Sequence, residues 1–405
     1  MTFILGGVQS DFARHLLREG KEVADLVGEL VDGALGDAQL EASDIGTIHV
    51  GNAFGQLFTG QGHLGAMPAT MRPALWGVPA ARHEAACASG SIAILAAMTE
   101  LEADRYDVAL VLGVEQERNV PGDQAAKFLG AAAWVGHEGD EANAARYLWP
   151  HMFSRIGDAY AERWGLQREH LVAIAQKNLA NARANPWAQT RGWAIDSFDD
   201  EVKNPVIEGR LRRYDCAQVT DGGAAIVLAS PRFAAGWASK RGRDLTKTPR
   251  ILGWGHRTAG LSLEAKLARS QGGGLLCPHV ADAIGDARRR AERGLDVIDA
   301  YEIHDCFTTT EYLAIDHLGL TPPGESWRAI EAGRTAKTGD APINPSGGLI
   351  GGGHPVGATG VRMALDAALQ VGGVAKTMQI EGARTVQTLN LGGSATTVVS
   401  LIIGT

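Results

Sequence analysis

Two distant stretches of this sequence carry similar residues in the same order. DIGTIHVGNAFGQLFTGQGHLG begins at Asp44, and DVIDAYEIHDCFTTTEYLAIDHLG begins at Asp296. Each opens with Asp, continues through an apolar run and a Phe, and closes with His-Leu-Gly. The offset is nearly constant, at 252 positions for the Asp (296 − 44) and 254 for the closing Gly (319 − 65). A segment that recurs in this way indicates a duplicated unit.

A second pair of segments repeats the pattern further along. CASGSIAILAA from Cys87 resembles HPVGATGVRMALDAA from His354, which pairs Ala-Ser-Gly at 88–90 with Ala-Thr-Gly at 358–360. Both lie between a strand-like segment and an apolar helical run. Chance matching among Ala- and Gly-rich segments is the alternative, and three features in one order disfavour it. Two copies of roughly 150 residues predict duplicated domains instead of a solenoid.

Each half alternates strand-like and helical segments, a pattern typical of an α/β fold in which helices cover a sheet. In the first half, helices are predicted over about 22–36 and 88–103, and the strands are ILGGV, TIHVGN, ARHEA and DVALVLG. In the second half, helices are predicted over about 278–293, 307–318 and 356–370, and the strands are RILGWGH, DAYEIH, RTVQTLNLG and SATTVVSLII.

A long segment between DVALVLG and DGGAAIVLAS interrupts the repeat. It contains helical stretches such as RIGDAYAERWG, and insertions of this length are usually functional or form subdomains. We therefore predict three parts: an N-terminal half of residues 1–114 plus 220–249, an inserted loop domain of residues 115–219, and a C-terminal half of residues 250–405. The insertion is expected to act as a lid or a ligand-binding subdomain.

Composition excludes several classes of protein. The 38 basic and 46 acidic residues give a net charge of −8 with no long basic run, which disfavours binding to nucleic acid or anionic lipid. Four cysteines without a CxxC pair favour reduced thiols over a disulfide framework or a structural zinc site. No apolar run is long enough to span a membrane. We expect a cytoplasmic protein.

Three strand-to-helix junctions carry residues capable of chemistry. Cys87 follows the strand ARHEA, His304 and Cys306 follow the strand DAYEIH, and His354 follows a glycine-rich turn with Pro355 as the expected first helical residue. Such junctions are where doubly wound sheets place ligands. A two-fold relation between the halves would bring the three junctions together.

Cys87 is the candidate nucleophile. A thiol with a pKa of about 8.5 is only a few per cent ionised at pH 7, and half ionisation needs about 2 kcal/mol. A helix N-terminus supplies about 0.3–1 kcal/mol. A neighbouring histidine is therefore required, and His354 is the candidate. A lone cysteine is ordinarily a small buried hydrophobe, but the junction and the matched position of His354 favour the nucleophile.

Four motifs together resemble the thiolases of the sterol-carrier-protein type. They are CASGS at Cys87, HDCF at 304–307, GGGHPVGATG around His354 and LNLGGSA near the C-terminus, and the similarity extends over nearly the whole chain. The resemblance implies two duplicated, mixed five-stranded sheets in an α-β-α-β-α layering with an inserted loop domain. It also implies coenzyme A thioesters as substrates, with no permanently bound cofactor and no metal.

The resemblance implies roles for particular residues. Cys87 would be acylated by an acyl-CoA or a 3-ketoacyl-CoA, and His354 would activate it and help to hold a thioester oxygen. A CoA thiolate or an enolate would then complete cleavage or condensation. This chemistry needs one thiolate, one acid/base group and donors for a developing oxyanion.

The sequence departs from many thiolases at two motifs. HDCF stands where many carry Asn-Glu-Ala-Phe, and Asn390-Leu391-Gly392 stands where many carry Cys-x-Gly. The usual acid/base cysteine is therefore absent. The sterol-carrier-protein type implies Cys306 as the acid/base and His304 as part of one oxyanion hole. Backbone N–H groups of Cys87 and Gly392 would form the other.

Several nearby residues have simpler interpretations. His-Asp-Cys is poor spacing for a metal site, because neighbours on a strand point to opposite faces. Asp305 is expected to cap the following helix. Cys216 and Cys277 are expected to be packing residues. The basic run KRGRDLTKTPR, residues 240–250, could meet the CoA phosphates, although solvated surface is favoured.

Two functions remain open. The first is an acyltransferase of the acetyl-CoA acetyltransferase or 3-ketoacyl-CoA thiolase type, acting in lipid metabolism as a homodimer or a dimer of dimers. The second is a thiolase-like subunit with little activity alone, which works in an acyltransferase or aldolase complex beside a small zinc-ribbon and oligonucleotide-fold partner. Acyl transfer to an acceptor other than CoA, or retro-aldol cleavage, is a further variant.

Overall fold

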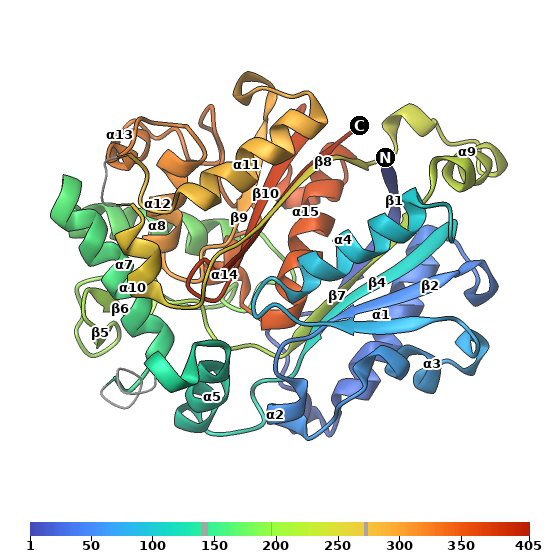
Figure 1. The fold of residues 1–405 in the computed structure, drawn as a ribbon, viewed down its shortest axis with the longest axis horizontal. Coiled ribbons are helices and arrows are strands. Elements are labelled where there is room, and N and C mark those ends of the chain that lie inside the picture. Colours follow the sequence, from blue (N-terminus) through green and yellow to red (C-terminus); the bar gives the residue numbers. More distant parts are fainter. Residues whose placement is uncertain (139–144, 196, 271–273) are drawn as a thin grey trace.

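A large mixed sheet organises the protein. The computed structural model describes residues 1–138, 145–195, 197–270 and 274–405 (Figure 1). Within them, nine strands form one sheet in the order β3-β2-β4-β7-β1-β8-β11-β10-β9. The bounds of these strands are β1 Thr2–Gln9, β2 Thr47–Gly51, β3 Ala80–His83, β4 Val108–Glu115, β7 Gly222–Ala229, β8 Arg250–Thr258, β9 Ala300–Ile303, β10 Thr385–Gly392 and β11 Thr397–Gly404.

The two ends of this sheet repeat one another. β4 lies between the parallel β2 and the antiparallel β7, as β10 lies between the parallel β9 and the antiparallel β11. β7 then pairs with β1, and β11 pairs with β8. The halves join where Thr2 and Phe3 of β1 pair with Ile251 and Arg250 of β8. The predicted duplicated α/β fold is therefore confirmed.

The strand count differs from the expected two sheets of five. The N-terminal half has its five strands, whereas the place beside β9 is held by a single bridge between Tyr301 and Ile343. Pro342 and Pro345 flank this bridge. Because proline has no N–H to donate to a ladder, a regular strand cannot continue there. The two halves form one continuous sheet because β1 pairs with β8.

Helices cover both faces and fill the centre in an α-β-α-β-α layering. The two central helices are α4 (Ser89–Glu102) and α15 (Thr359–Val371), which pack against each other. α15 also contacts strands of both halves, and the apolar core between the layers combines Ile94 and Val361 with Val111 and Val399. The outer layers are α1 (Val23–Ala38) on one side, and α11 (Pro278–Ala291) with α12 (Thr308–His317) on the other. The predicted helices are confirmed to within a few residues at each end.

Most of the insertion packs against the C-terminal half, whereas its first helix packs against Phe54 and Phe58 of the N-terminal half. Its elements are α5 Gly122–Leu129, α7 Leu148–Trp164, α8 Arg168–Arg183, and a two-stranded sheet of β5 Val206–Glu208 and β6 Leu211–Arg212. α7 and α8 contact α12 at the left of Figure 1. Apolar side chains such as Phe153 and Tyr160 join the core that contains Ile303. This packing fixes the insertion beside the loop that follows β9.

Short helices complete the fold. They are α2 Gly55–Thr59, α3 Met67–Met71, α9 Pro231–Lys240, α10 Leu263–Ala268, α13 Ser326–Glu331 and α14 Gly348–Gly352. Among the described residues, none of the helices has the length and hydropathy needed to cross a bilayer.

Candidate active site

The three junctions singled out in the sequence meet at one cavity. Cys87, Cys306 and His354 all border a cavity of about 360 Å³. The sulfur of Cys87 and one ring nitrogen each of His304 and His354 lie within 4.8 Å of one another. The rings of His304 and His354 meet edge to face, with 5.1 Å between their centroids. Both halves of the duplication thus contribute to the same site.

A strained turn presents Cys87. β3 ends at His83, and Ala86 has a φ of 50°, in the left-handed region that costs a non-glycine residue about 1–3 kcal/mol. Ser89 holds this turn, because its Oγ accepts from the N–H of Ala85 and donates to the carbonyl of Ala86. Gly392 lies against the same turn, where a Cβ would stand 2.2 Å from the oxygen of Ala85. Only glycine lets β10 approach so closely.

Electrostatics keeps the Cys87 thiol protonated. Burial, and then the carboxyls of Glu117 and Glu115, raise its pKa to about 12, although backbone N–H groups of Gly393 and of Cys87 itself oppose the change. Gly393, the residue after the expected Gly392, borders the cavity together with Cys87. A helix N-terminus is not enough to ionise this thiol. A base beside it is required.

His354 is held by hydrogen bonds at its backbone and its ring. Its N–H donates to Thr220 Oγ1 at 2.9 Å, and its Nδ1 lies 2.7 Å from Thr359 Oγ1. The Thr359 hydroxyl donates to the carbonyl of Pro355 and so accepts from Nδ1–H of the ring. This leaves Nε2 with a free lone pair. Burial and Arg362 lower the pKa of His354 to about 3, so that the ring is neutral at pH 7.

Pro355 differs slightly from its predicted position. It caps the short 3-10 turn Val356–Ala358, which leads into α15, and it is not the first residue of the helix. The carbonyl of Pro355 accepts from the N–H of Ala358 and from the hydroxyl of Thr359. The turn therefore serves to orient the imidazole of His354.

His304 is almost fully enclosed. It is 1% exposed, and burial followed by the neighbouring His354 lowers its pKa well below the ordinary value. Its Nδ1 lies 3.1 Å from Nδ2 of Asn390. Its Nε2 is buried and has no hydrogen-bond partner within the described residues. The hydrogen-bonding capacity of this nitrogen is therefore unused within the protein.

Cys306 also borders the cavity. Its sulfur lies 3.6 Å from Thr310 Oγ1, and burial, then Cys87, raise its pKa well above that of a free thiol. Cys306 is therefore a protonated thiol at rest. Cys216, expected to be a packing residue, also borders the cavity, and burial raises its pKa as well. Cys277 lies in the core, 2% exposed, as expected.

The expected role of Asp305 is wrong. Phe307, and not Asp305, precedes α12 as its cap residue. The Asp305 carboxylate accepts instead from the N–H groups of Leu349 and Ile350 and from Nδ2 of Asn178. It caps α14 across a tertiary contact, which no local pattern reveals. The glycine-rich segment before His354 is thereby fixed.

Replacing Asp305 by alanine tests this anchor. Two buried N–H groups and an amide would lose their acceptor, which is expected to cost about 2–4 kcal/mol of stability. Urea or thermal unfolding monitored by circular dichroism measures the change. Asp305→Asn retains one acceptor oxygen and should lose clearly less. Equal stability of the alanine variant and the unmodified protein would contradict this role.

Other contributors to the site had no signal in the sequence. Glu115 accepts from Nδ2 of Asn52 and from the N–H groups of Ala53, Phe54 and Gly357, so it links the ends of β2 and β4 to the start of α15. Burial raises its pKa to about 7. Such a cluster forms only when the strands are assembled.

The cavity is largely apolar. Its only charged lining residue among those described is Arg213, which also lies over the ring of Trp193. The apolar lining residues include Phe54, Leu129, Trp149, Phe153, Phe307 and Val356. Thioesters with hydrocarbon groups suit such a surface.

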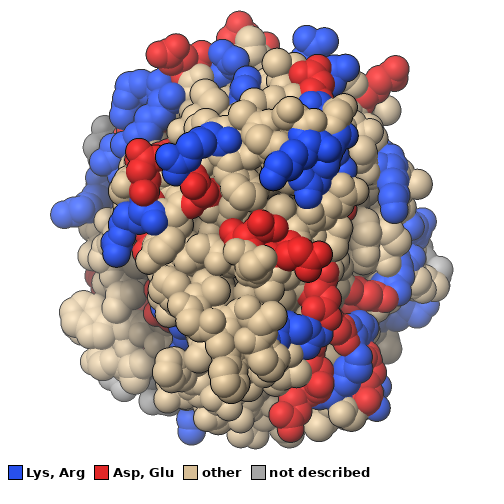
Figure 2. Space-filling view, turned by 90° about the vertical axis from the view of Figure 1, so that its right-hand side faces the viewer, with Lys and Arg blue, Asp and Glu red and all other residues tan. Residues whose placement is uncertain are grey.

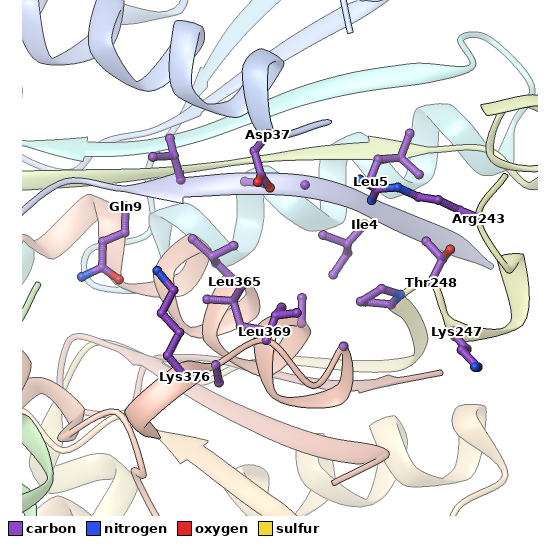
Figure 3. A pocket seen from close by; sticks show the side chains of 18 of the residues that line it. Ile4, Leu5, Gln9, Asp37, Arg243, Lys247, Thr248, Leu365, Leu369 and Lys376 are labelled. Atoms are coloured by element: carbon purple, nitrogen blue, oxygen red, sulfur yellow. The ribbon is translucent and has the colours of Figure 1, made fainter. Parts of the chain in front are cut away.

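The basic run at 240–250 lies elsewhere. Arg243 and Lys247 line a separate cavity of about 640 Å³, which also includes Lys376, Leu365 and Leu369 beside β1 (Figure 3). That cavity lies along the C-terminal part of α15, whereas the candidate active site lies at its N-terminal end. The structure gives no contact between this run and the candidate active site.

Comparisons with known proteins agree with the fold and the motifs. Residues 2–232 match the family described as thiolase, N-terminal domain, and residues 265–405 match that described as thiolase C-terminal domain-like. An acetyl-CoA acetyltransferase of Methanothermobacter thermautotrophicus is 31% identical over 92% of this chain and 92% of its own length. Human sterol carrier protein 2 is 28% identical over 99% of this chain and 71% of its own.

Solved structures share the fold. An Ltp2-ChsH2(DUF35) aldolase superposes with a TM-score of 0.78 at 22% identity, covering all of this chain and 97% of the other. An acetyl-CoA acetyltransferase from Syntrophomonas wolfei superposes with a TM-score of 0.72 at 18% identity, covering all of this chain and 98% of the other. At these identities the likeness establishes the architecture alone.

Proposed function

Because this chain belongs to the thiolase family and is an acyltransferase, we propose that it transfers acyl groups through a thioester on Cys87. Its substrates are acyl-CoA and 3-ketoacyl-CoA thioesters, and it needs no permanently bound cofactor. The observation that carries the proposal is the shared cavity, which brings Cys87, His354 and Cys306 to one apolar surface. Relatives named acetyl-CoA acetyltransferase support it.

The first half of the cleavage reaction acylates Cys87. Nε2 of His354 takes the proton of the thiol, and the sulfur attacks the 3-keto carbon of the substrate. The bond between C2 and C3 then breaks, and the thiol of Cys306 protonates C2 of the departing acetyl-CoA enolate. The raised pKa of Cys306 suits this step, since an acid must hold its proton at rest.

The second half returns every group to its starting state. A CoA thiol gives its proton to the Cys306 thiolate, and its sulfur attacks the acyl carbonyl. The bond from Cys87 to the acyl carbon breaks, and the Cys87 thiolate recovers its proton from His354. Condensation is the same sequence in reverse. In both directions, donors beside the carbonyl stabilise a developing oxyanion.

The function is tested by trapping the intermediate. Mass spectrometry after incubation with acetyl-CoA or acetoacetyl-CoA should find one acetyl group on the peptide that contains Cys87. The Cys87→Ala variant should carry no such group. Absence of an acyl adduct on every residue of the unmodified protein would contradict the proposal.

The pH profile follows from the environment of His354. Acylation requires the neutral ring, and its pKa is lowered to about 3 from an ordinary value of about 6.5. We therefore expect the single-turnover acylation rate to stay constant as the pH falls from about 8 to 5. Below pH 6.5 the unfolded chain binds a proton at His354 that the folded protein does not, so stability falls from there toward pH 3. A half-maximal acylation rate near pH 6.5 would contradict this assignment.

A second candidate is a subunit that works only with a partner. The likeness in fold to an Ltp2-ChsH2(DUF35) aldolase supports it. In that case a small zinc-ribbon and oligonucleotide-fold protein would supply part of the active assembly. Turnover can be measured for the isolated chain and for the chain together with any co-purifying protein. Equal rates in the two samples would exclude this candidate.

The free edge of the sheet supports a homodimer. Within the described parts of the chain β3 pairs with β2 alone, and Ala80 and Ala81 are exposed along it. Trp76, which precedes this strand, is 74% exposed. α3 and the end of β2 lie at the right of Figure 1, and Figure 2, which faces that side, shows a broad surface without charged side chains. Edge strands of this kind pair readily with one another. Light scattering on the purified chain tests this, and a monomer would contradict it.

A further inference from the structure

Asn390 connects the two halves of the site through its side-chain amide. Its Nδ2 lies 3.1 Å from the carbonyl oxygen of Cys87 and 3.1 Å from Nδ1 of His304. Its Oδ1 accepts from Ser91 Oγ at 2.7 Å. Asn390 is 1% exposed, so no water competes for these contacts. All of its donors and one acceptor site are therefore occupied.

These contacts fix the orientation of the amide. A carbonyl oxygen such as that of Cys87 can only accept, so the group facing it must be the NH₂ of Asn390. The second hydrogen of that NH₂ points at Nδ1 of His304. An NH₂ has no lone pair to offer, so Nδ1 must be the acceptor.

The tautomer of His304 follows. A neutral imidazole carries one proton, and the low pKa of His304 keeps the ring neutral. With Nδ1 accepting from Asn390, that proton is on Nε2. This is the nitrogen that is buried without a partner. His304 therefore carries an N–H donor at Nε2, whereas His354 keeps a lone pair at its own Nε2.

We propose that Asn390 is a positioning residue that locks His304 as an Nε2–H donor for the oxygen of the substrate thioester. The inference rests on the proposed function for the identity of that oxygen, whereas the tautomer itself does not depend on it. It gives Asn390 a role distinct from that of the acid/base cysteine which many thiolases carry at this position. The lone pair needed to bind a metal at Nε2 is also removed.

Asn390→Asp tests the lock, because a carboxylate has nearly the same shape and accepts where the amide donates. At about pH 8.5 the ring stays neutral, and its proton is expected to move to Nδ1. Loss of one oxyanion donor is expected to lower kcat by about 10²- to 10³-fold. KM should change little, because the donor acts mainly in the transition state.

A double-mutant cycle separates this role from a structural one. In His304→Asn an amide N–H can serve as the donor whatever residue 390 does. Adding Asn390→Asp to His304→Asn should therefore cost only a few-fold. Equal losses in both backgrounds would overturn the inference.

Nitrogen NMR reads the tautomer without any assay of activity. In protein labelled with ¹⁵N at histidine, His304 should show a protonated Nε2 and an unprotonated Nδ1, and Asn390→Asp should exchange the two signals. The His304→Asn variant assigns them. Nδ1–H in the unmodified protein would overturn the inference even if Cys87 is acylated. The expected tautomer together with no acyl adduct would instead reject the proposed function alone.

Discussion

Replacing His354 with alanine is expected to slow the acylation of Cys87 by about 10³- to 10⁴-fold at neutral pH. The thiol has a pKa of about 12, so very little thiolate exists without a base. His354 is neutral and keeps a free lone pair at Nε2, so it can accept this proton as the sulfur attacks the carbonyl. Rapid-quench measurement of acetyl transfer from acetyl-CoA gives the rate directly.

The acylation rate of the His354→Ala variant should also increase with pH. Without His354, acylation should rise about tenfold per pH unit, because it then follows the thiolate fraction below the pKa of Cys87. His137→Ala is the matched control, because this histidine is exposed and lies outside the cavity lining. A loss below about tenfold in His354→Ala would show that another group deprotonates the thiol.

Replacing Cys306 with alanine is expected to impair cleavage of the carbon–carbon bond while leaving the acylation of Cys87 intact. Acylation from acetyl-CoA releases a sulfur, and it needs no proton on carbon. Cleavage of acetoacetyl-CoA requires protonation of C2, for which Cys306 is the proposed acid. Cleavage should therefore fall by about 10²- to 10⁴-fold, while acetyl-Cys87 still forms from acetyl-CoA. Both steps can be followed on the same preparation.

Cys277→Ala is the matched control for that variant. Cys277 is as deeply buried as Cys306 but lies in the core, outside the cavity lining. Its replacement is expected to affect stability more than the rate of cleavage. If Cys306→Ala and Cys277→Ala lose activity to a similar degree, Cys306 acts through packing and not as an acid.

The sequence was sufficient to predict the duplicated architecture because local patterns are repeated in each half. The helix that begins after Cys87 and the helix that begins after His354 start at equivalent points of their repeats, and both lie in the central layer. An apolar run between a strand and a glycine-rich turn leaves few other arrangements. The positions of strands and long helices therefore followed from periodicity.

Other features depend on contacts that no local pattern encodes. Pro342 and Pro345 limit the fifth strand of the second half, although the family resemblance implied a five-stranded sheet there. Asp305 binds α14 and not the helix beside it in sequence. A buried carboxylate accepts hydrogen bonds from whichever N–H groups the fold places beside it.

The same limit applies to the candidate site. Its residue types were recognisable from motifs, but protonation states were not. The high pKa of Cys87 and the low pKa of His354 come mainly from burial, which exists only after folding. The contact between Asn390 and His304 joins residues of neighbouring strand ends. The tautomer of His304 follows from it only when both hydrogens of the amide are accounted for.

The most direct measurement is a crystal structure of the Cys306→Ala variant soaked with acetyl-CoA. The account predicts an acetyl group bonded to Cys87, its oxygen within hydrogen-bonding distance of Nε2 of His304, and the pantetheine in the 360 Å³ cavity. An unmodified Cys87, with coenzyme A bound in the separate cavity beside β1 or at another surface, would contradict it.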